Sequence, residues 1–351
     1  MSPTGCLQNP WQADRRTTSL SCLYGFIPVA DKDTSPSREA DPGMRLGAPP
    51  AAPVRRAALK IPKTPLRSRF ELLEEIGRGG LSRVYKARDL VAIRAGLSDA
   101  VVALKVMAAG ADVGDDLVSL MHREARRLRD LVHPNIVRVY DMDNEGRLHF
   151  MVMEYLEGMS FAKILREADG HRLALPQIDR LVRDVAAALA FAHGRGVVHS
   201  DLKPANIFIE TGGRVKLIDF NIACPVARPI KVSEEDTVAI LGRLGALTPA
   251  YASPQRLAGA EPSSGDDVFS LGLVTYLALT GRKPFHAGGA AAAVAENEAI
   301  AKPEGLSWWR WQALRAALAL DDRERLSDVG RFARLFTGGP LVEPAWRAGL
   351  R

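Results

Sequence analysis

The stretch HSDLKPAN, residues 199–206, carries the strongest signal in this chain. Asp201 is followed five residues later by Asn206, a spacing that places a general base and a metal ligand in one tight loop. Eighteen residues after Asp201 stands Asp219, within the run LIDFN. A carboxylate between apolar residues needs a partner, and Mg²⁺ is a suitable one. The two motifs at this spacing predict a metal-dependent site.

Upstream of this loop, residues 77–84 read GRGGLSRV. Glycines such as Gly77 and Gly79 let backbone N–H groups approach phosphate oxygens closely, because they lack a Cβ atom. An ordinary glycine turn between two strands is the alternative, and Ser82 stands where phosphate-binding loops of this kind often have a further glycine. The run therefore supports nucleotide binding only together with other motifs.

A lysine stands inside an apolar strand, in VALK at residues 102–105. Burial of a charged group is costly unless the group is paired. Lys105 therefore either pairs with a carboxylate or lies at a strand edge facing water. Glu124, within a segment of helical spacing, is the candidate partner, and a solvated helix charge is the alternative for it.

Composition divides the chain into a basic leader and a balanced remainder. Of the 351 residues, 47% are hydrophobic and 25% charged, as is typical of a globular protein. The formal net charge is +6, and residues 1–68 hold ten Lys and Arg against five Asp and Glu. We expect this Pro- and Ala-rich leader to be flexible. The remainder has no charge excess that predicts a partner nucleic acid.

Three separated cysteines, Cys6, Cys22 and Cys224, match neither a disulfide framework nor a zinc site. No apolar run reaches the roughly 18 to 20 residues that a membrane-spanning helix needs. The N-terminus also lacks the basic-then-apolar order of a signal peptide. We therefore expect a cytoplasmic protein without a transmembrane segment.

Hydrophobic periodicity predicts a β-rich part followed by a larger helical part. The runs expected to form strands are 70–80, 81–90, 100–108, 136–143 and 147–156, and those expected to form helices are 115–132, 178–196 and 267–281. We predict four segments: a leader (1–68), a small β-rich lobe (69–157), a larger helical lobe (158–337) and a short tail (338–351).

These motifs together resemble the eukaryotic-type (Hanks-type) protein kinase family, in its bacterial serine/threonine form. The resemblance covers about three quarters of the chain, from Phe70 to Phe336. The family elements occur in order: the glycine loop, Lys105, Glu124, HPNIV (133–137), MEYLEG (153–158), the loop at 199–206, Asp219, TPAYASPQ (248–255), DDVFSLG (266–272), GRKPF (281–285) and Arg325. The resemblance implies a two-lobed α+β protein-kinase-like fold and transfer of the γ-phosphate of ATP.

The resemblance also implies roles for single residues. Asp201 would orient the attacking hydroxyl and accept its proton, and Lys203 would neutralise the γ-phosphate. Asn206 and Asp219 would hold Mg²⁺, with Mn²⁺ as the alternative metal. Lys105, fixed by Glu124, would hold the α- and β-phosphates.

A further set of residues would enclose ATP in such a fold. Gly77 and Gly79 of the glycine loop would approach the phosphates. Ile76, Val84 and Ala103 would cover the adenine from above and Phe208 from below. Met153 would be the gatekeeper, and the backbone of Glu154 and Leu156 would hydrogen-bond the adenine edge. Four apolar or aromatic side chains match the stack that couples the lobes in this family: Leu128, Val139, His199 and Phe220.

Lys203 and Thr248 resemble the corresponding residues of serine/threonine kinases, which implies protein substrates phosphorylated on Ser or Thr, this chain itself included. Two alternatives are an ATP-binding pseudokinase scaffold and a small-molecule phosphotransferase of the aminoglycoside or choline kinase type. Phosphotransferases of that type share an H-x-D-x-x-x-x-N loop and a later Asp. They lack the TPAYASPQ segment.

Three residues depart from the family pattern. Ser200 replaces an arginine that grips a phosphate on the activation loop, so we expect activity to depend weakly on such phosphorylation. Asn221 replaces a glycine, and asparagine tolerates positive φ better than most residues. Gln255 replaces the glutamate that pairs with the late arginine, here Arg325, so an ion pair becomes a charged–neutral contact. The connection 89–100 is longer than usual and carries no functional prediction.

The segment LSWWRWQALRAALALDDRERLSDVGRFARLF, with HSDLKPANIF and LTPAYASPQRLAG, resembles a subgroup of proteobacterial kinases associated with type VI secretion control. Trp308, Trp309 and Trp311 within it are expected in the core. A cognate phosphatase is a further expected partner. The candidate self-phosphorylation sites are Ser233, Thr237, Thr17, Thr18, Ser19, Ser35 and Ser37.

Overall fold

The computed structural model describes residues 64–78, 82–98, 100–108, 128–146, 148–168, 172–220, 248–285, 289–296 and 298–338. The predictions for the leader before residue 64, the tail after residue 338 and most of the helix at 115–132 lie outside these residues. The remaining predicted elements can be compared with the structure.

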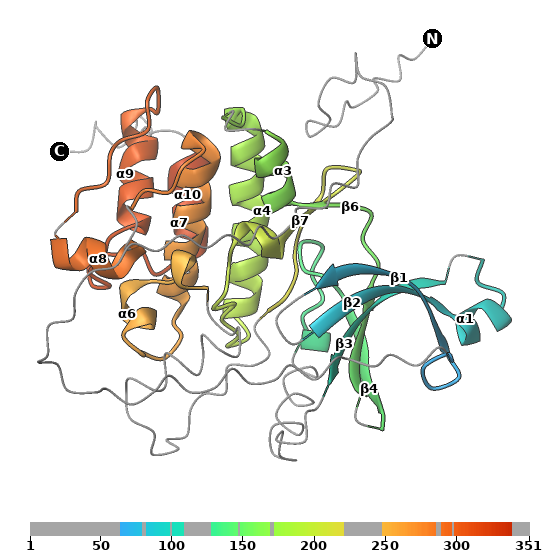
Figure 1. Ribbon diagram of the computed structural model, residues 1–351. Helices are drawn as coiled ribbons and strands as arrows, with labels where there is room; N and C mark the ends of the chain where they lie inside the picture. The colour runs from blue at the N-terminus through green and yellow to red at the C-terminus, as the bar shows by residue number, and fades with distance from the viewer. Residues whose placement is uncertain are drawn as a thin grey trace, which may run out of the picture. The chain divides into compact units, whose positions relative to one another are not determined.

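Within the described residues, five strands form one antiparallel sheet in the order β1-β2-β3-β5-β4 (Figure 1). Their bounds are β1 (Phe70–Arg78), β2 (Ser82–Asp89), β3 (Val101–Ala108), β4 (Val139–Glu145) and β5 (Leu148–Glu154). All five predicted strands are confirmed, and their ends differ from the expected ones by at most three residues.

Alternation along β3 and β5 gives this sheet two apolar faces. Leu104 of β3 and Phe150 of β5 pack in a small cluster with Phe70, whose ring meets that of Phe150 edge-on at 5.9 Å. Ala103 of β3 and Met151 of β5 instead join the large cluster that includes the helices. The second face is therefore the one that meets the helical part, and Lys105 shares it with Ala103.

The long connection after β2 contains a short helix, α1 (Leu90–Arg94). Asp89 is the N-cap of this helix, because its side chain accepts hydrogen bonds from the backbone N–H groups of Val91 and Ala92. The same carboxylate pairs with Arg69 at 2.6 Å, and this pairing lowers the pKa of Asp89. The extra residues thus form a capped turn beside the sheet.

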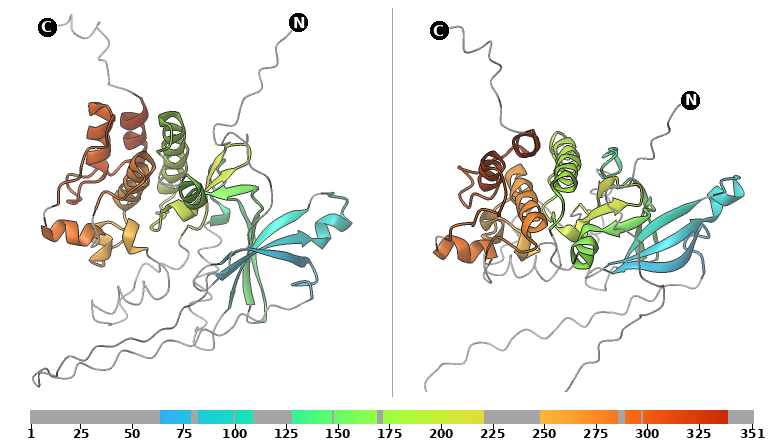
Figure 2. Two further views of the ribbon diagram at one scale, coloured as in Figure 1. Left: turned by 45° about the horizontal axis from the view of Figure 1, so that its top comes forward. Right: turned by 90° about the horizontal axis from the view of Figure 1, so that it is seen from above.

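The second part combines a small sheet with packed helices (Figure 2). Its described strands pair in the order β6 (Gly158–Ser160), β7 (Ile207–Glu210) and β8 (Val215–Leu217). Its described helices are α3 (Phe161–Glu167), α4 (Leu175–His193), α6 (Pro254–Leu257), α7 (Ser264–Thr280), α8 (Gly289–Glu296), α9 (Trp308–Ala317) and α10 (Val329–Thr337), with single 3₁₀ turns at Pro204–Asn206 and Pro249–Tyr251.

Helix α7 lies at the centre of the helical part. Most of its residues are buried, including polar Asp266 and Asp267 in its first turn. A helix that is apolar on all sides belongs in a core, and α7 contacts α4, α9 and α10. The order of a sheet-rich part before a helix-rich part confirms the predicted α+β architecture. No described helix combines the length and apolar character needed to cross a bilayer.

Candidate active site

The register of the sheet brings several candidate nucleotide-binding residues together. Gly77 on β1 pairs with Val84 on β2, and Val84 pairs with Lys105 on β3. Ala103, two residues before Lys105 and so on the same face, pairs with Met153 on β5. These residues line one continuous surface on the face of the sheet that meets the helices.

Other candidates border this surface. Ile76 precedes Gly77 and is 45% exposed. Leu156 follows β5 and packs against the large apolar cluster. Phe208 lies on β7, directly across from Lys216 on β8. Gly79 and Glu124 lie outside the described residues, so the predicted Lys105–Glu124 pair stays a prediction.

Lys105 has a carboxylate partner from the second part of the chain. Its Nζ lies 2.5 Å from Oδ1 of Asp219, across 114 residues of sequence. Partial burial acts to raise the pKa of Asp219, but the charge and hydrogen bond of Lys105 outweigh it and leave that pKa below its ordinary value. Asp219 is therefore held as a carboxylate.

Asp201 is surrounded by donors in a tight loop. Lys203 Nζ lies 2.5 Å from Asp201 Oδ2 and 2.6 Å from the hydroxyl of Thr248. The backbone N–H of Thr248 donates to Asp201 Oδ1 at 3.1 Å. The amide of Asn206 donates to the backbone carbonyl of Asp201 at 2.9 Å and to its Oδ2 at 3.3 Å. The loop and Thr248 thus fix the position of the Asp201 carboxylate.

The backbone around this loop is held by Asp267 at the start of α7. Its carboxylate accepts hydrogen bonds from the N–H groups of His199 (2.8 Å) and Ser200 (2.9 Å), and it lies 2.7 Å from His193 Nε2. Ser200 and Asp219 both have left-handed backbones, with φ of 65° and 57°. Such conformations cost free energy in residues other than glycine, and they persist only where the surroundings enforce them.

His199 is fully buried and neutral. Burial lowers the pKa of its imidazole, and the nearby Asp267 carboxylate opposes this only in part. Its Nδ1 accepts from the N–H of Asp201 at 3.4 Å, and its Nε2 lies 3.3 Å from the carbonyl oxygen of Ile218. These two partners assign the proton to Nε2.

The predicted stack between the two parts of the chain is buried as a unit. Leu128, Val139 and Phe220 all belong to the large apolar cluster. The rings of His199 and Phe220 are 4.6 Å apart. This column therefore connects the loop at 199–206 with the sheet.

Asn206 and Asp219 are suited to a divalent cation. The amide nitrogen of Asn206 faces Asp201, so its amide oxygen is the group that can bind metal. Asp219 follows Ile218, whose N–H donates to the carbonyl of Asn206 at 2.9 Å, so the two candidates are neighbours. One carboxylate and one amide oxygen fit Mg²⁺, which takes its remaining ligands from water and phosphate. No group of three or more acidic, His or Cys side chains that could hold a metal occurs among the described residues.

The predicted charged–neutral contact of Gln255 with Arg325 is present. Arg325 donates to the side-chain oxygen of Gln255 at 2.7 Å, and Gln255 donates to the carbonyl of Leu320 at 2.8 Å. Asp266 lies 3.7 Å from the buried guanidinium and supplies a carboxylate. The negative charge lost at position 255 is thus replaced from α7. Asn221 lies outside the described residues.

A buried ion pair that the sequence patterns did not predict joins Lys216 on β8 to Glu154 at 2.5 Å. One signal was present in the sequence. Lys216 interrupts the apolar run from Val215 to Ile218, just before Asp219. A lysine in such a run needs a carboxylate, but spacing alone does not identify which one.

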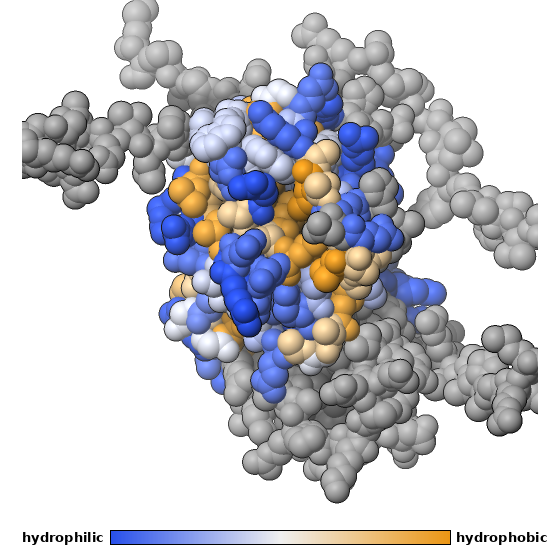
Figure 3. All heavy atoms as spheres, turned by 90° about the vertical axis from the view of Figure 1, so that its left-hand side faces the viewer, coloured by the Kyte–Doolittle hydropathy of each residue, from blue (hydrophilic) through white to orange (hydrophobic). Residues whose placement is uncertain are grey.

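A separate groove of about 1260 Å³ lies between α6, α8 and α9. Apolar side chains gather on this face of the molecule (Figure 3). Gln255 and Trp311 line the groove, and none of the predicted catalytic, metal or nucleotide residues does. Trp309 and Trp311 are half-buried, whereas Trp308 is 70% exposed, so the prediction of a core position is wrong for Trp308. Trp308 is the first residue of α9, where fewer neighbouring residues cover a side chain than in the middle of a helix.

Comparison with known proteins agrees with this geometry. The family model of the protein kinase domain matches residues 70–329. The chain belongs to the protein kinase family. Protein kinases use ATP and a divalent metal ion, which fits the residues described above.

Known bacterial kinases are similar to this kinase over its matched region. The serine/threonine-protein kinase PrkC of Bacillus subtilis is 30% identical over 69% of this chain and 35% of PrkC. The serine/threonine-protein kinase PknB of Mycobacterium leprae is 37% identical over 63% of this chain and 34% of PknB. This kinase spans at most 40% of the length of the first curated relatives that it matches. The crystal structure of the Mycobacterium tuberculosis PknI kinase domain shares the fold, with a TM-score of 0.57, 22% identity and coverage of 77% of this chain and 95% of that chain.

Proposed function

We propose that this kinase transfers the γ-phosphate of ATP to Ser or Thr hydroxyls of protein substrates, itself included. One observation carries the proposal: the loop that fixes Asp201 lies beside Asp219, and Asp219 is paired with the sheet lysine Lys105. A base, a metal ligand and a phosphate-binding cation are thus brought together from separate parts of the chain.

In the proposed reaction, Asp201 orients the substrate hydroxyl and accepts its proton. The substrate oxygen bonds to the γ-phosphorus as the bond from that phosphorus to the β–γ bridging oxygen breaks. Lys203, 2.5 Å from Asp201, offers positive charge to the transferring group. A bound Mg²⁺, held by Asn206 and Asp219, would neutralise charge on the phosphates; Mn²⁺ is the alternative metal.

The nucleotide would lie against the surface formed by the sheet. We propose that Lys105 binds the α- and β-phosphates once ATP is present. Gly77 and Gly79 of the glycine loop would approach the phosphates. Ile76, Val84 and Ala103 would cover the adenine from above and Phe208 from below. Met153 would be the gatekeeper, and the backbone of Glu154 and Leu156 would hydrogen-bond the adenine edge. Glu124 remains a proposed second partner of Lys105, in addition to Asp219.

Several finer proposals rest on the sequence. The segments 1–68, 69–157, 158–337 and 338–351 are the proposed leader, lobes and tail. The type VI secretion subgroup rests on residues 306–336 and on the motifs around the catalytic loop. A cognate phosphatase and the candidate phosphorylation sites, which lie outside the described residues, stay predictions. So does the cytoplasmic placement inferred from the three separated cysteines.

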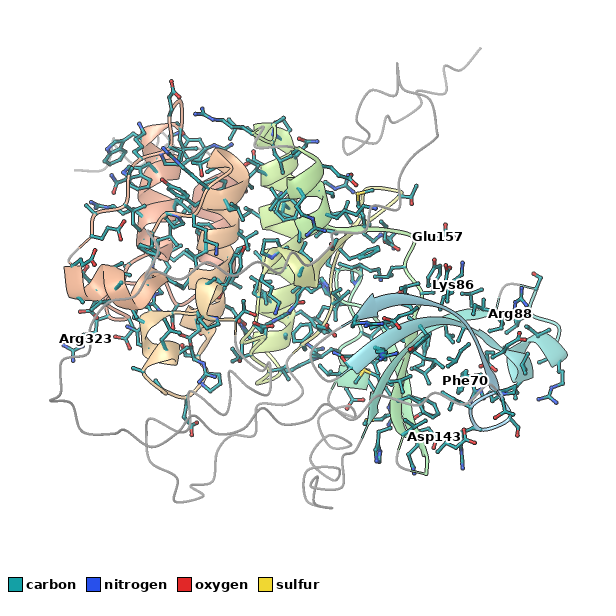
Figure 4. All side chains as sticks on the ribbon, viewed as in Figure 1. Phe70, Lys86, Arg88, Asp143, Glu157 and Arg323 are labelled. Carbon is teal, nitrogen blue, oxygen red and sulfur yellow. The ribbon has the colours of Figure 1, made fainter. Side chains whose placement is uncertain are left out.

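The test is incubation of the full chain with radiolabelled ATP and Mg²⁺ or Mn²⁺, beside Asp201→Asn and Asp143→Asn. Asp143 is a matched control because it pairs with Arg67 at the sheet edge (Figure 4). We expect label on Ser or Thr, a fall of about 10²-fold or more for Asp201→Asn, and no change for Asp143→Asn.

Other outcomes would reject the proposal in distinct ways. Label on tyrosine would overturn the substrate class. Label transferred only to a small molecule would identify a small-molecule phosphotransferase. ATP binding without transfer, also in the presence of protein substrates, would identify a pseudokinase.

A further inference from the structure

Lys216 is a buried lysine on β8, three residues before Asp219. Lys216 is only 5% exposed, and its Nζ lies 2.5 Å from Glu154 Oε1. A lysine in this position needs an anionic partner, because a buried charge without one is strongly destabilising. The structure provides that partner from the end of β5.

Glu154 is fixed by a third segment. Its Oε1 also accepts a hydrogen bond from the backbone N–H of Arg138 at 2.7 Å. Its own N–H donates to the carbonyl of Arg138 at 2.9 Å. Glu154 therefore closes a ring with Arg138, and Lys216 is attached to this ring from the opposite part of the chain.

The strand register places the pair at two borders of the proposed adenine site. Lys216 pairs across the β7–β8 ladder with Phe208, so the two side chains share a face. Glu154 is the last residue of β5 and is the first hinge residue, where the hinge is residues 154–157 joining β5 to β6. One ion pair thus connects β8, the strand paired with the one that carries Phe208, with the backbone proposed to bind the adenine edge.

We propose that Glu154 and Lys216 are positioning residues that set the spacing between the hinge and Phe208, and thereby control the affinity for adenine. The pair does not touch the reacting phosphate in this assignment. Its loss therefore affects nucleotide binding much more than the transfer step. This inference rests on the proposed placement of ATP.

The experiment compares four full-length variants with the wild type. Lys216→Met breaks the pair, and Glu154→Leu/Lys216→Met removes both charges so that neither is left buried alone. Lys216→Arg retains the charge and serves as the conservative rescue. Arg310→Met is the matched control, because the largely buried Arg310–Asp179 pair joins α9 to α4 away from the hinge.

The measurements are the Kd values of ADP and of adenosine, the KM for ATP, and kcat. For Lys216→Met and the double variant we expect Kd and KM to rise about tenfold, with kcat within about twofold of the wild type. Adenosine and ADP should weaken by the same factor, because the lost contact concerns adenine. Lys216→Arg should recover most of the affinity, and Arg310→Met should leave all four values unchanged.

The inference is overturned if ADP weakens while adenosine does not, which would assign Lys216 to the phosphates. It is also overturned if Lys216→Met and the double variant lose only thermal stability, or if their kcat falls as much as their KM rises. A wild type that binds neither ADP nor adenosine would instead reject the proposed function. Normal wild-type binding with an unchanged double variant would reject this inference alone.

Discussion

His199 and Asp219 show how their surroundings set the protonation of single side chains. Burial keeps His199 neutral, so Nδ1 can accept from the Asp201 N–H and Nε2 can donate to Ile218. Lys105 keeps Asp219 ionised despite its partial burial. The two groups therefore present a neutral support at the start of the catalytic loop and a charged ligand beside the loop.

Protonation of His199 should destabilise the fold in mild acid. Because the folded-state pKa lies below the unfolded value of about 6.5, the stabilising effect is present above that pH and is lost as pH falls below it. We expect urea unfolding to show up to about 1.4 kcal/mol less stability at pH 5.5 than at pH 7.5 from this residue. His199→Phe, which does not titrate, should show a shallower pH dependence. An equal slope in both proteins would contradict the assignment.

The junction of β6 with β7 depends on a single glycine. Gly158 has φ of 152°, and an added Cβ would lie 2.1 Å from the carbonyl oxygen of Ile209. Gly158 pairs with Glu210 at the start of the three-stranded sheet. Side chains are thus excluded at the point where the chain leaves the hinge.

Gly158→Ala should therefore lower the free energy of unfolding by about 2 kcal/mol or more, because the backbone of β6 must shift away from β7. Gly212→Ala is the matched control, since nothing lies within 4 Å of the added Cβ there and its φ is not in the left-handed region. Chemical denaturation would measure both. Equal stability of the two variants would show that β6 can shift without cost.

Three elements of the helical part meet at Arg325. It donates to Gln255 of α6 and to the carbonyls of Ala319 and Leu320 after α9, and it lies near Asp266 of α7. The neutral Gln255 is therefore one of several partners. The ion pair of Arg325 is the one with Asp266 of α7.

Arg325→Met should cost about 3 kcal/mol of stability, because Asp266 would stay buried without its cation. Gln255→Ala should cost about 1 kcal/mol, the usual value of one hydrogen bond. Both can be measured as urea-unfolding free energies. A larger loss for Gln255→Ala than for Arg325→Met would mean that the side-chain contact, and not the charge of α7, holds this junction.

The two parts of the chain are joined where the catalytic site forms. The Lys105–Asp219 pair, the Glu154–Lys216 pair and the bridge of Ile136 to Leu217 all connect the sheet-rich part to the segment around β8. Figure 1 shows the chain passing between the parts from β5 to β6. Two ion pairs and one backbone bridge therefore hold the two parts together at the site, in addition to the chain segment that joins them.

Lys105→Met should shift the pH range of metal–nucleotide binding upward. In the wild type the lowered pKa keeps Asp219 ionised. The contribution of Asp219 to metal binding is therefore lost only as pH falls through that low pKa. Without Lys105, burial, which raises the pKa of Asp219, is opposed only by the weaker effects of His199 and Lys203. Titration of Mg²⁺-dependent ADP binding from pH 4.5 to pH 8 should show an acid midpoint at higher pH in the variant. Lys163→Met, from the exposed Lys163–Glu167 pair of α3, is the control and should keep the wild-type midpoint.

The local features of this kinase could be predicted from residue types and their spacing. Strand alternation places Ala103 and Lys105 on one face, and the interval from Asp201 to Asn206 brings both into one loop, because these relations extend over a few residues. Partners distant in sequence were decided by the tertiary structure. Lys105 meets Asp219, 114 residues away, and Lys216 meets Glu154, 62 residues away. Ion pairs and hydrogen bonds act over a few ångströms of space, and only the packing of the sheet against the helices selects which of many carboxylates comes that close.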